Sequence, residues 1–325
     1  MNRRQFITAT AAATAVLTTT GFAAQTTKKI LPTKGELPKG PVSLYYEFRV
    51  VAQENDALLS AIKTHTEAFK HQKGFLSLSL KQMSGDSTAV HNYPSQYKGI
   101  LGEAFLDGVA AHTQPYFYSL FVRFSSYSDL LASKTDEWFA STIVPLLHGY
   151  FKGANGLVKT PSPMAHYRGV YETIAAGNRE GIFTKSSDLI SFLKQPVDGS
   201  DETLVTVANH VMVNDATHQA IEGEVVKLLT VAQQTFQPMD DPKGLGLPGT
   251  KENTYYRRAL STEILRNAFP DGALRAYLLH GVWLSVWDHE NSHLDPRFVA
   301  AVTLVGGAVV VGPVEPFYKA RITIA

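Results

Sequence analysis

The apolar positions of the chain switch repeatedly between the two-residue period of a β-strand and the 3.6-residue period of an α-helix. Residues 43–52 and 116–124 are rich in aromatic and β-branched side chains, which indicates strands. Between them, Leu58, Ile62 and Phe69 fall on one face of a predicted helix. For the first half, the pattern predicts strands over 43–52, 75–82, 116–124 and 164–174, a helix from Asn55 to Gly74, and a helix from Ser128 or Asp129 toward Tyr150.

The second half repeats this order of elements. Its predicted strands cover 204–213, 255–260, 276–287 and 316–324, and its predicted helices run from Asn214 or Asp215 to about Gln233 and onward from Asp288. Each half therefore reads β-α-β-β-α-β, which is the ferredoxin-like unit. We expect an α+β fold in which two tandem ferredoxin-like repeats form an internal pseudo-dimeric α+β barrel, because joining the two sheets leaves neither with a bare edge.

The two repeats are predicted to cover residues 42–195 and 196–325, the second carrying the candidate metal site. The connection between them, about 175–201, is polar and contains Gly177, Pro196 and Gly199. Residues 24–41 have no apolar period and predict a flexible leader.

The N-terminal residues 1–23 resemble an export signal. Arg3-Arg4 precede an apolar, Ala- and Thr-rich stretch, and Gly21-Phe22-Ala23 offers small residues for cleavage before Ala24. This pattern predicts passage through the twin-arginine translocation machinery to the periplasm or the medium, with no membrane anchor after cleavage. An ordinary secretory signal that happens to carry Arg-Arg is the alternative.

Net charge, hydropathy and cysteine content exclude several classes of protein and of metal site. The formal net charge is +1 and the chain has no Lys/Arg-rich run, which argues against a nucleic-acid surface. The mean hydropathy of −0.07 and the absence of a long apolar segment exclude a polytopic membrane protein. The chain has no cysteine, so iron–sulfur clusters and thiolate ligands are excluded. Any metal would have to be bound by histidine, carboxylate or backbone oxygen.

Three residues near the C-terminus form a candidate metal site. His289 and His293 are four residues apart and would share one face of a helix, and Glu315 follows between two prolines that hold its backbone rigid. Two histidines and one carboxylate on one side of a metal leave other positions open, as in non-haem iron oxygenases. An isolated His pair at this spacing is more often a polar helix surface, and a lone Glu315 is more often a surface residue.

The three groups meet only if the chain between them folds back. A straight helix of about 20 residues spans about 30 Å, which would hold His289 and Glu315 too far apart for one metal. Pro296 offers a break, because proline can end one helix and start another at an angle. Asp288 is the predicted N-cap of the first helix.

Two stretches near the C-terminus resemble the metal-site motif of a known family. The stretch Trp287-Asp288-His289-Glu290-Asn291-Ser292-His293, followed by Gly312-Pro313-Val314-Glu315-Pro316-Phe317-Tyr318, is similar to the iron site of sulfur oxygenase reductases. Those proteins are tandem ferredoxin-like folds related to the antibiotic-biosynthesis-monooxygenase superfamily of dimeric α+β barrels. The resemblance implies mononuclear non-haem iron held by His289, His293 and Glu315.

Two departures limit what the resemblance implies. In the family the motif belongs to the first repeat, whereas here it lies in the second. The family also depends on a cysteine that carries a persulfide near the iron, and this chain has none. The metal site can thus be inherited without sulfur chemistry, and the family's large hollow assembly does not carry over.

Four further residues could line the pocket or support the metal ligands: His280, His210, Asp288 and Tyr318. A histidine on a strand face is more often a satisfied core residue, and this is the favoured interpretation of His280 and His210.

The resulting hypothesis is an exported mononuclear non-haem iron oxygenase that acts on a small molecule with dioxygen. Another divalent metal would fit the same ligands, and the chain could form an oligomer. One alternative is a haem- or small-molecule-binding monooxygenase-like barrel, in which His148 or His210 could be the axial ligand. The other is a non-catalytic periplasmic binding protein.

Overall fold

A computed structural model describes residues 37–85, 108, 111, 114–178, 180–196, 201–233, 259–292 and 296–325. The predicted signal peptide and most of the predicted leader lie outside these residues. So does His293, one of the three predicted metal ligands.

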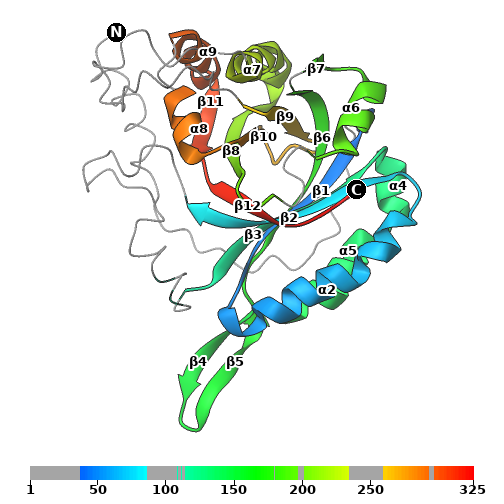
Figure 1. Cartoon of the computed structure of the whole chain (residues 1–325), viewed down its shortest axis with the longest axis vertical. Coiled ribbons are helices and arrows are strands. Elements are labelled where there is room, and N and C mark those ends of the chain that lie inside the picture. Colours follow the sequence, from blue (N-terminus) through cyan, green and yellow to red (C-terminus); the bar gives the residue numbers. More distant parts are fainter. Residues whose placement is uncertain are drawn as a thin grey trace.

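The fold is a closed antiparallel β-barrel covered by helices (Figure 1). Its strands follow the order β1-β3-β2-β12-β8-β10-β9-β6, and β6 returns to pair with β1. The barrel strands are β1 Val42–Val50, β2 Phe75–Gly85, β3 Tyr116–Phe124, β6 Tyr167–Asn178, β8 Val205–Asn214, β9 Ser261–Asn267, β10 Leu274–Trp283 and β12 Phe317–Ile324. Two short strands are added at the side, β7 Gly181–Phe183 on β6 and β11 Val309–Val314 on β8.

The barrel consists of two ferredoxin-like sheets. The strand orders β6-β1-β3-β2 and β12-β8-β10-β9 are the same when each half is numbered from its own first strand. Two seams join the sheets, where β2 pairs with β12 and β6 pairs with β9. The predicted tandem ferredoxin-like α+β barrel is therefore confirmed.

Helices cover the two halves separately (Figure 1). On the first half, alternate residues of β1, such as Leu44 and Phe48, pack with Leu58 and Ile62 of α2 in one apolar core. A second core lies between the second sheet and its helices α7 and α9. The helices are α2 Ala52–Lys70, α4 Tyr127–Ala132, α5 Thr135–Trp138, α6 Ser186–Leu193, α7 His218–Gln233, α8 Val286–Ser292 and α9 Pro296–Gly306.

The remaining strand positions point into the barrel. Tyr45, Phe121, Tyr171, Leu265 and Leu278 form a third apolar cluster there. Each strand thus has a helix-covered outer face and an inner face, as the two-residue period requires. The two faces hold different sets of polar residues.

The predicted single helix from residue 128 toward Tyr150 is wrong. Ser126 is the N-cap of α4, since its side chain accepts a hydrogen bond from the Asp129 amide. Lys134 then takes a left-handed conformation with φ 55° and separates α4 from α5. A π-helical turn η3, Phe139–Ile143, and a 3₁₀ turn η4, Val144–Leu146, follow.

Tyr150 belongs to a hairpin that was not predicted. The strands β4 His148–Gly153 and β5 Gly156–Pro163 pair only with each other and project from the barrel (Figure 1).

Two strands of the second half also differ from their predicted ranges. β9 covers 261–267 rather than 255–260, and residues 255–258 lie outside the described residues. β10 ends at Trp283, so Trp287 lies in α8 rather than at a strand end. Within the described residues, no helix is long and apolar enough to cross a membrane.

Candidate functional site

The outer face of the second sheet carries a half-buried carboxyl group, Glu315. Val207 and Val211 of β8 belong to the apolar core on this face, so Asn209 between them points the same way. Asn209 Nδ2 donates a hydrogen bond of 2.5 Å to Glu315 Oε1. Burial raises the pKa of Glu315 to about 7, although the Asn209 bond alone would lower it. At neutral pH this carboxyl group exists in both protonation states.

Gly312 and Pro313 bring the chain to this position. Gly312 has a φ of 100°, and a Cβ placed on it would lie 2.5 Å from the backbone oxygen of His210. Only glycine permits this close approach to β8. Pro316 then accepts a backbone hydrogen bond from Ala208, which fixes the chain beside β8 before β12 begins.

His289 reaches the same face from α8. Its ring is buried and makes edge contacts with the rings of Trp283 and Phe317, at centroid distances of 5.1 and 5.6 Å. Phe317 belongs to the outer apolar core and follows Glu315 by two residues. His289 and Glu315 therefore lie on the same face of the sheet.

Two helices lie in the connection between them, α8 ending at Ser292 and α9 beginning at Pro296. The break predicted at Pro296 adjoins residues 293–295, which lie outside the described residues, so the bend stays a prediction. The N-cap of α8 is Ser285 rather than the predicted Asp288, because Ser285 Oγ accepts from the Asp288 amide and donates to Asp288 Oδ2.

Only two of the three predicted metal ligands, His289 and Glu315, lie within the described residues. No group of three or more His, Asp or Glu side chains in the described part of the chain is arranged to hold a metal ion. His293 lies outside that part, so the structure places two of the three predicted ligands on one face and says nothing of the third.

The other predicted pocket residues lie on different surfaces. His210, Tyr318 and His280 point into the barrel, on the opposite side of the sheet from Glu315. They therefore do not support the predicted metal ligands directly. His148, an alternative axial ligand, lies in the β4–β5 hairpin, where its Nδ1 is 2.6 Å from the carbonyl oxygen of Thr160.

Inside the barrel, Glu47 is the centre of one polar cluster. Its Oε1 accepts hydrogen bonds from the hydroxyl groups of Tyr45, at 2.5 Å, and Tyr318, at 3.4 Å. His210 Nε2 lies 3.1 Å from the same oxygen. Burial would raise the pKa of Glu47, but His210 and the two tyrosines outweigh it, so the pKa is lowered. Glu47 is thus held as a carboxylate.

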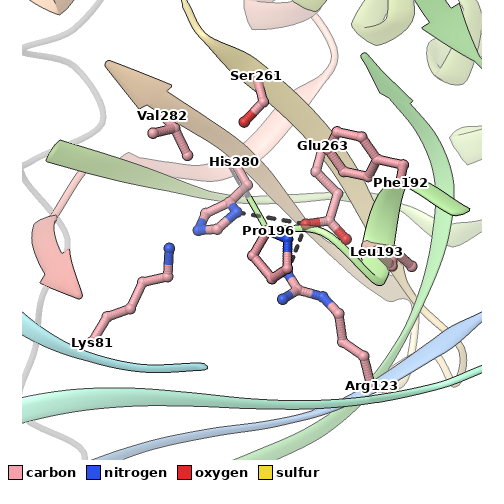
Figure 2. A pocket seen from close by; sticks show the side chains of 9 residues that line it. All are labelled: Lys81, Arg123, Phe192, Leu193, Pro196, Ser261, Glu263, His280 and Val282. Atoms are coloured by element: carbon pink, nitrogen blue, oxygen red, sulfur yellow. Dashed lines mark hydrogen bonds and ion pairs between the residues drawn. The ribbon is translucent and has the colours of Figure 1, made fainter. Parts of the chain in front are cut away.

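A second interior cluster centres on Glu263 (Figure 2). Arg123 of the first half reaches across the barrel, and its Nη2 lies 2.7 Å from Glu263 Oε2. Thr173 Oγ1 donates to the other carboxylate oxygen at 2.8 Å, and His280 Nδ1 lies 3.6 Å from Oε2. Burial opposes ionisation, but Arg123, His280 and Thr173 together lower the pKa of Glu263 to about 2. The two halves of the barrel are therefore joined by a buried ion pair.

The sequence interpretation missed Glu47, Arg123, Glu263 and Asn209. The sequence did indicate Glu47, Arg123 and Glu263, because each is a charged residue within an aromatic or β-branched strand. Charged side chains are rarely buried unless they are paired or functional. Asn209 carries no such signal, because its partner Glu315 is distant in sequence.

Two family models match parts of the chain. Residues 41–129 match the ABM-like domain, and residues 174–321 match the CT0912-like, C-terminal domain. A search of curated proteins found no match.

Solved structures share the fold at low sequence identity. A candidate monooxygenase from Fusobacterium nucleatum subsp. nucleatum is 8% identical, with a TM-score of 0.50 over 87% of this chain and 94% of that one. A candidate monooxygenase from Lactobacillus acidophilus is 9% identical, with a TM-score of 0.47 over 88% and 99% of the two chains. An anthrone oxidase-like protein is 12% identical, with a TM-score of 0.48 over 88% and 93%.

The ABM-like match and the shared fold of the Fusobacterium nucleatum protein support the α+β barrel. Neither family model is that of the sulfur oxygenase reductases, so this more specific resemblance stays a prediction.

Proposed function

We propose that this protein is an oxidoreductase that oxidises a small molecule with dioxygen, and that Glu315 takes a proton from the substrate. The observation that carries the proposal is the half-buried Glu315 carboxyl group, which accepts a hydrogen bond from Asn209 and whose pKa burial raises to about 7. A general base is most effective when its pKa lies near the working pH. The monooxygenase-like fold supports the oxidative part of the reaction.

A base with a raised pKa suits a substrate with a weakly acidic C–H or O–H group. Asn209 fixes one oxygen of the Glu315 carboxyl group, and Val207 and Val211 on either side of Asn209 belong to an apolar core. Proton removal leaves an electron-rich anion that dioxygen oxidises. The overall balance for an activated methylene group is CH₂ plus O₂ giving C=O plus H₂O, so dioxygen accepts the electrons and one of its atoms leaves as water.

Oxygen consumption with a panel of phenolic and C–H-acidic aromatic compounds tests this function. We expect turnover by the wild-type protein and a loss of about 10²-fold or more in Glu315→Gln, which keeps the shape but cannot take the proton. Glu67→Gln is the matched control, because Glu67 is an exposed carboxylate on α2. Equal rates for wild type and Glu315→Gln would refute the role of Glu315.

A metal-dependent version of this function is the second candidate. The observation in its favour is that His289 and Glu315 lie on one face of the second sheet. With His293, these two residues would hold a divalent metal such as mononuclear non-haem iron, which supplies open positions for dioxygen or substrate. One oxygen of Glu315 already accepts from Asn209, an arrangement that also orients carboxylate ligands in metal sites.

Elemental analysis separates the two versions. The metal-dependent version predicts about one iron per wild-type chain, lost in both His289→Ala and Glu315→Ala. Full oxygen consumption by metal-free protein would support the metal-free version and end the second candidate. A haem absorption band would instead support the haem alternative.

A further inference from the structure

A small cavity lies inside the barrel beside the Arg123–Glu263 ion pair (Figure 2). Its volume is about 30 Å³, which is enough for about two water molecules. It lies on the inner side of the sheet and is separate from the Glu315 region. Its walls are formed by Lys81, Arg123, Phe192, Leu193, Pro196, Ser261, Glu263, His280 and Val282.

Two buried polar atoms in its walls have no hydrogen-bond partner, Arg123 Nε and His280 Nε2. The two residues are only 4% and 6% exposed. A buried polar group without a partner costs about 1–3 kcal/mol, so such groups in a native protein usually mark a missing water or ligand. Both of these atoms belong to residues that line the same cavity.

Arg123 Nε and His280 Nε2 require different hydrogen-bond partners. Arg123 Nε can only donate. His280 Nδ1 faces the Glu263 carboxylate, so the proton belongs on Nδ1 and leaves Nε2 as an acceptor. Burial first, and the positive charges of Lys81 and Arg123, lower the pKa of His280 and keep the ring neutral. The cavity therefore needs a group that both accepts and donates.

Lys81 adds a positive charge to the same wall. Its Nζ donates a 2.8 Å hydrogen bond to Thr206 within the barrel. Glu263 does not oppose a second acid group strongly, because both of its oxygens are already engaged by Arg123 and Thr173.

Apolar side chains also line the cavity. Phe192 and Leu193 at the end of α6, with Pro196 after it, form part of its wall (Figure 2). A buried hydrogen bond of 2.7 Å from Ser77 Oγ to the carbonyl oxygen of Leu193 fixes the end of α6 against β2. The wall thus combines charged and apolar side chains.

We propose that this cavity binds the carboxyl group of a short aliphatic acid. The two carboxyl oxygens occupy the space of two waters, so only an acid of one or two carbon atoms fits. One oxygen accepts from Arg123 Nε and Lys81, and the other shares its proton with His280 Nε2. The remaining carbon contacts the apolar part of the wall formed by Phe192, Leu193 and Pro196. Two water molecules alone would satisfy the same polar atoms, and the experiment distinguishes the two occupants.

Titration of the full chain with ¹³C-labelled formate and acetate, followed by NMR, tests the site. We expect saturable binding to the wild type, weakened at least about tenfold in Lys81→Met, which corresponds to about 1.4 kcal/mol. Lys152→Met is the matched control, because Lys152 is an exposed lysine on β4.

Folding of each variant is checked by circular dichroism and thermal melting. If Lys81→Met does not fold, Ser261→Leu fills the cavity without removing a charge and is expected to abolish binding. No binding by folded wild-type protein means that the cavity holds water only and overturns the proposal. Binding that Ser261→Leu and Lys81→Met both leave unchanged overturns it too. Glu315→Gln is expected to bind acetate normally, so a failure of the proposed oxidase function would not affect this result.

Discussion

Polar residues that are neighbours on one strand of this barrel lie on opposite faces and in different chemical environments. Neighbouring residues of β8 point to opposite faces, so Asn209 serves Glu315 outside while His210 lies beside Glu47 inside. The environments differ accordingly. Glu47 and Glu263 have donors that stabilise their charge, whereas Glu315 has one amide and an apolar neighbourhood, and only its pKa is raised.

The raised pKa of Glu315 predicts a pH-dependent stability. The folded pKa of about 7 exceeds the ordinary value of 4.5, so the folded state binds the proton more tightly than the unfolded state. This contribution is complete below pH 4.5 and is lost as the pH rises to about 7. Urea unfolding at several pH values should show that wild type loses about 1–3 kcal/mol over this range relative to Glu315→Gln. Parallel curves for the two proteins would contradict the raised pKa.

The Arg123–Glu263 ion pair across the barrel predicts that the effects of substituting its two residues on the free energy of unfolding are strongly coupled. Arg123→Met leaves the Glu263 carboxylate buried without its main partner and should cost about 3–5 kcal/mol. The double variant Arg123→Met/Glu263→Gln should recover most of this loss, since the uncompensated charge is gone. Chemical denaturation of the single and double variants measures the coupling. Simple additivity of the two substitutions would show that the pair contributes nothing to stability.

At the scale of elements, the sequence predicts the strands better than the connections. The predicted ranges of β1, β3, β8 and β12 lie within two residues of the observed ones, and for β1 and β3 the aromatic and β-branched content was the signal. The helix predicted from residue 128 fails because local features interrupt it. Ser133 Oγ lies 2.6 Å from Thr135 Oγ1 around the left-handed Lys134, and Pro145 enters a 3₁₀ turn. Such effects depend on single residues and not on a period.

The β4–β5 hairpin could have been predicted from its turn. Ala154 and Asn155 form the turn, and Gly156 follows with a φ of 118°, as in hairpins where a glycine comes directly after the turn. The candidate site could be predicted only in part, because some of its residues are close together in the sequence and others are not. The motif around His289 and Glu315 can be read locally, whereas the partners Asn209 and Arg123 come close only through the closed barrel.

The N-cap of α8 gives a prediction at this scale. Ser285→Ala removes the side chain that accepts from the Asp288 amide and should destabilise the protein by about 0.5–2 kcal/mol. In the metal-dependent version the substitution should also lower the oxidase activity, because His289 follows on the same short helix. Ser187→Ala on the exposed face of α6 is the control. Thermal melting and oxygen consumption are measured together, and an unchanged melting temperature would contradict the capping role.

For the whole molecule, we propose export by the twin-arginine route, as the N-terminal sequence predicts. Replacing Arg3 and Arg4 by lysine should keep the precursor in the cytoplasm, because the machinery reads the arginine pair as an address. Cell fractionation followed by immunoblotting of precursor and mature forms measures the effect. Unchanged export of the Lys-Lys variant would favour the ordinary secretory route.

The seam between β2 and β12 has a consequence for how the protein is made. Ser84 on β2 donates to the carbonyl oxygen of Phe317 on β12, a residue 233 positions later. Until the ribosome has released β12, the first sheet keeps an unpaired edge, and such edges invite association with other chains. Pairings between distant parts of a chain also form slowly. The newly made first half is therefore the form of this protein that most needs protection by chaperones.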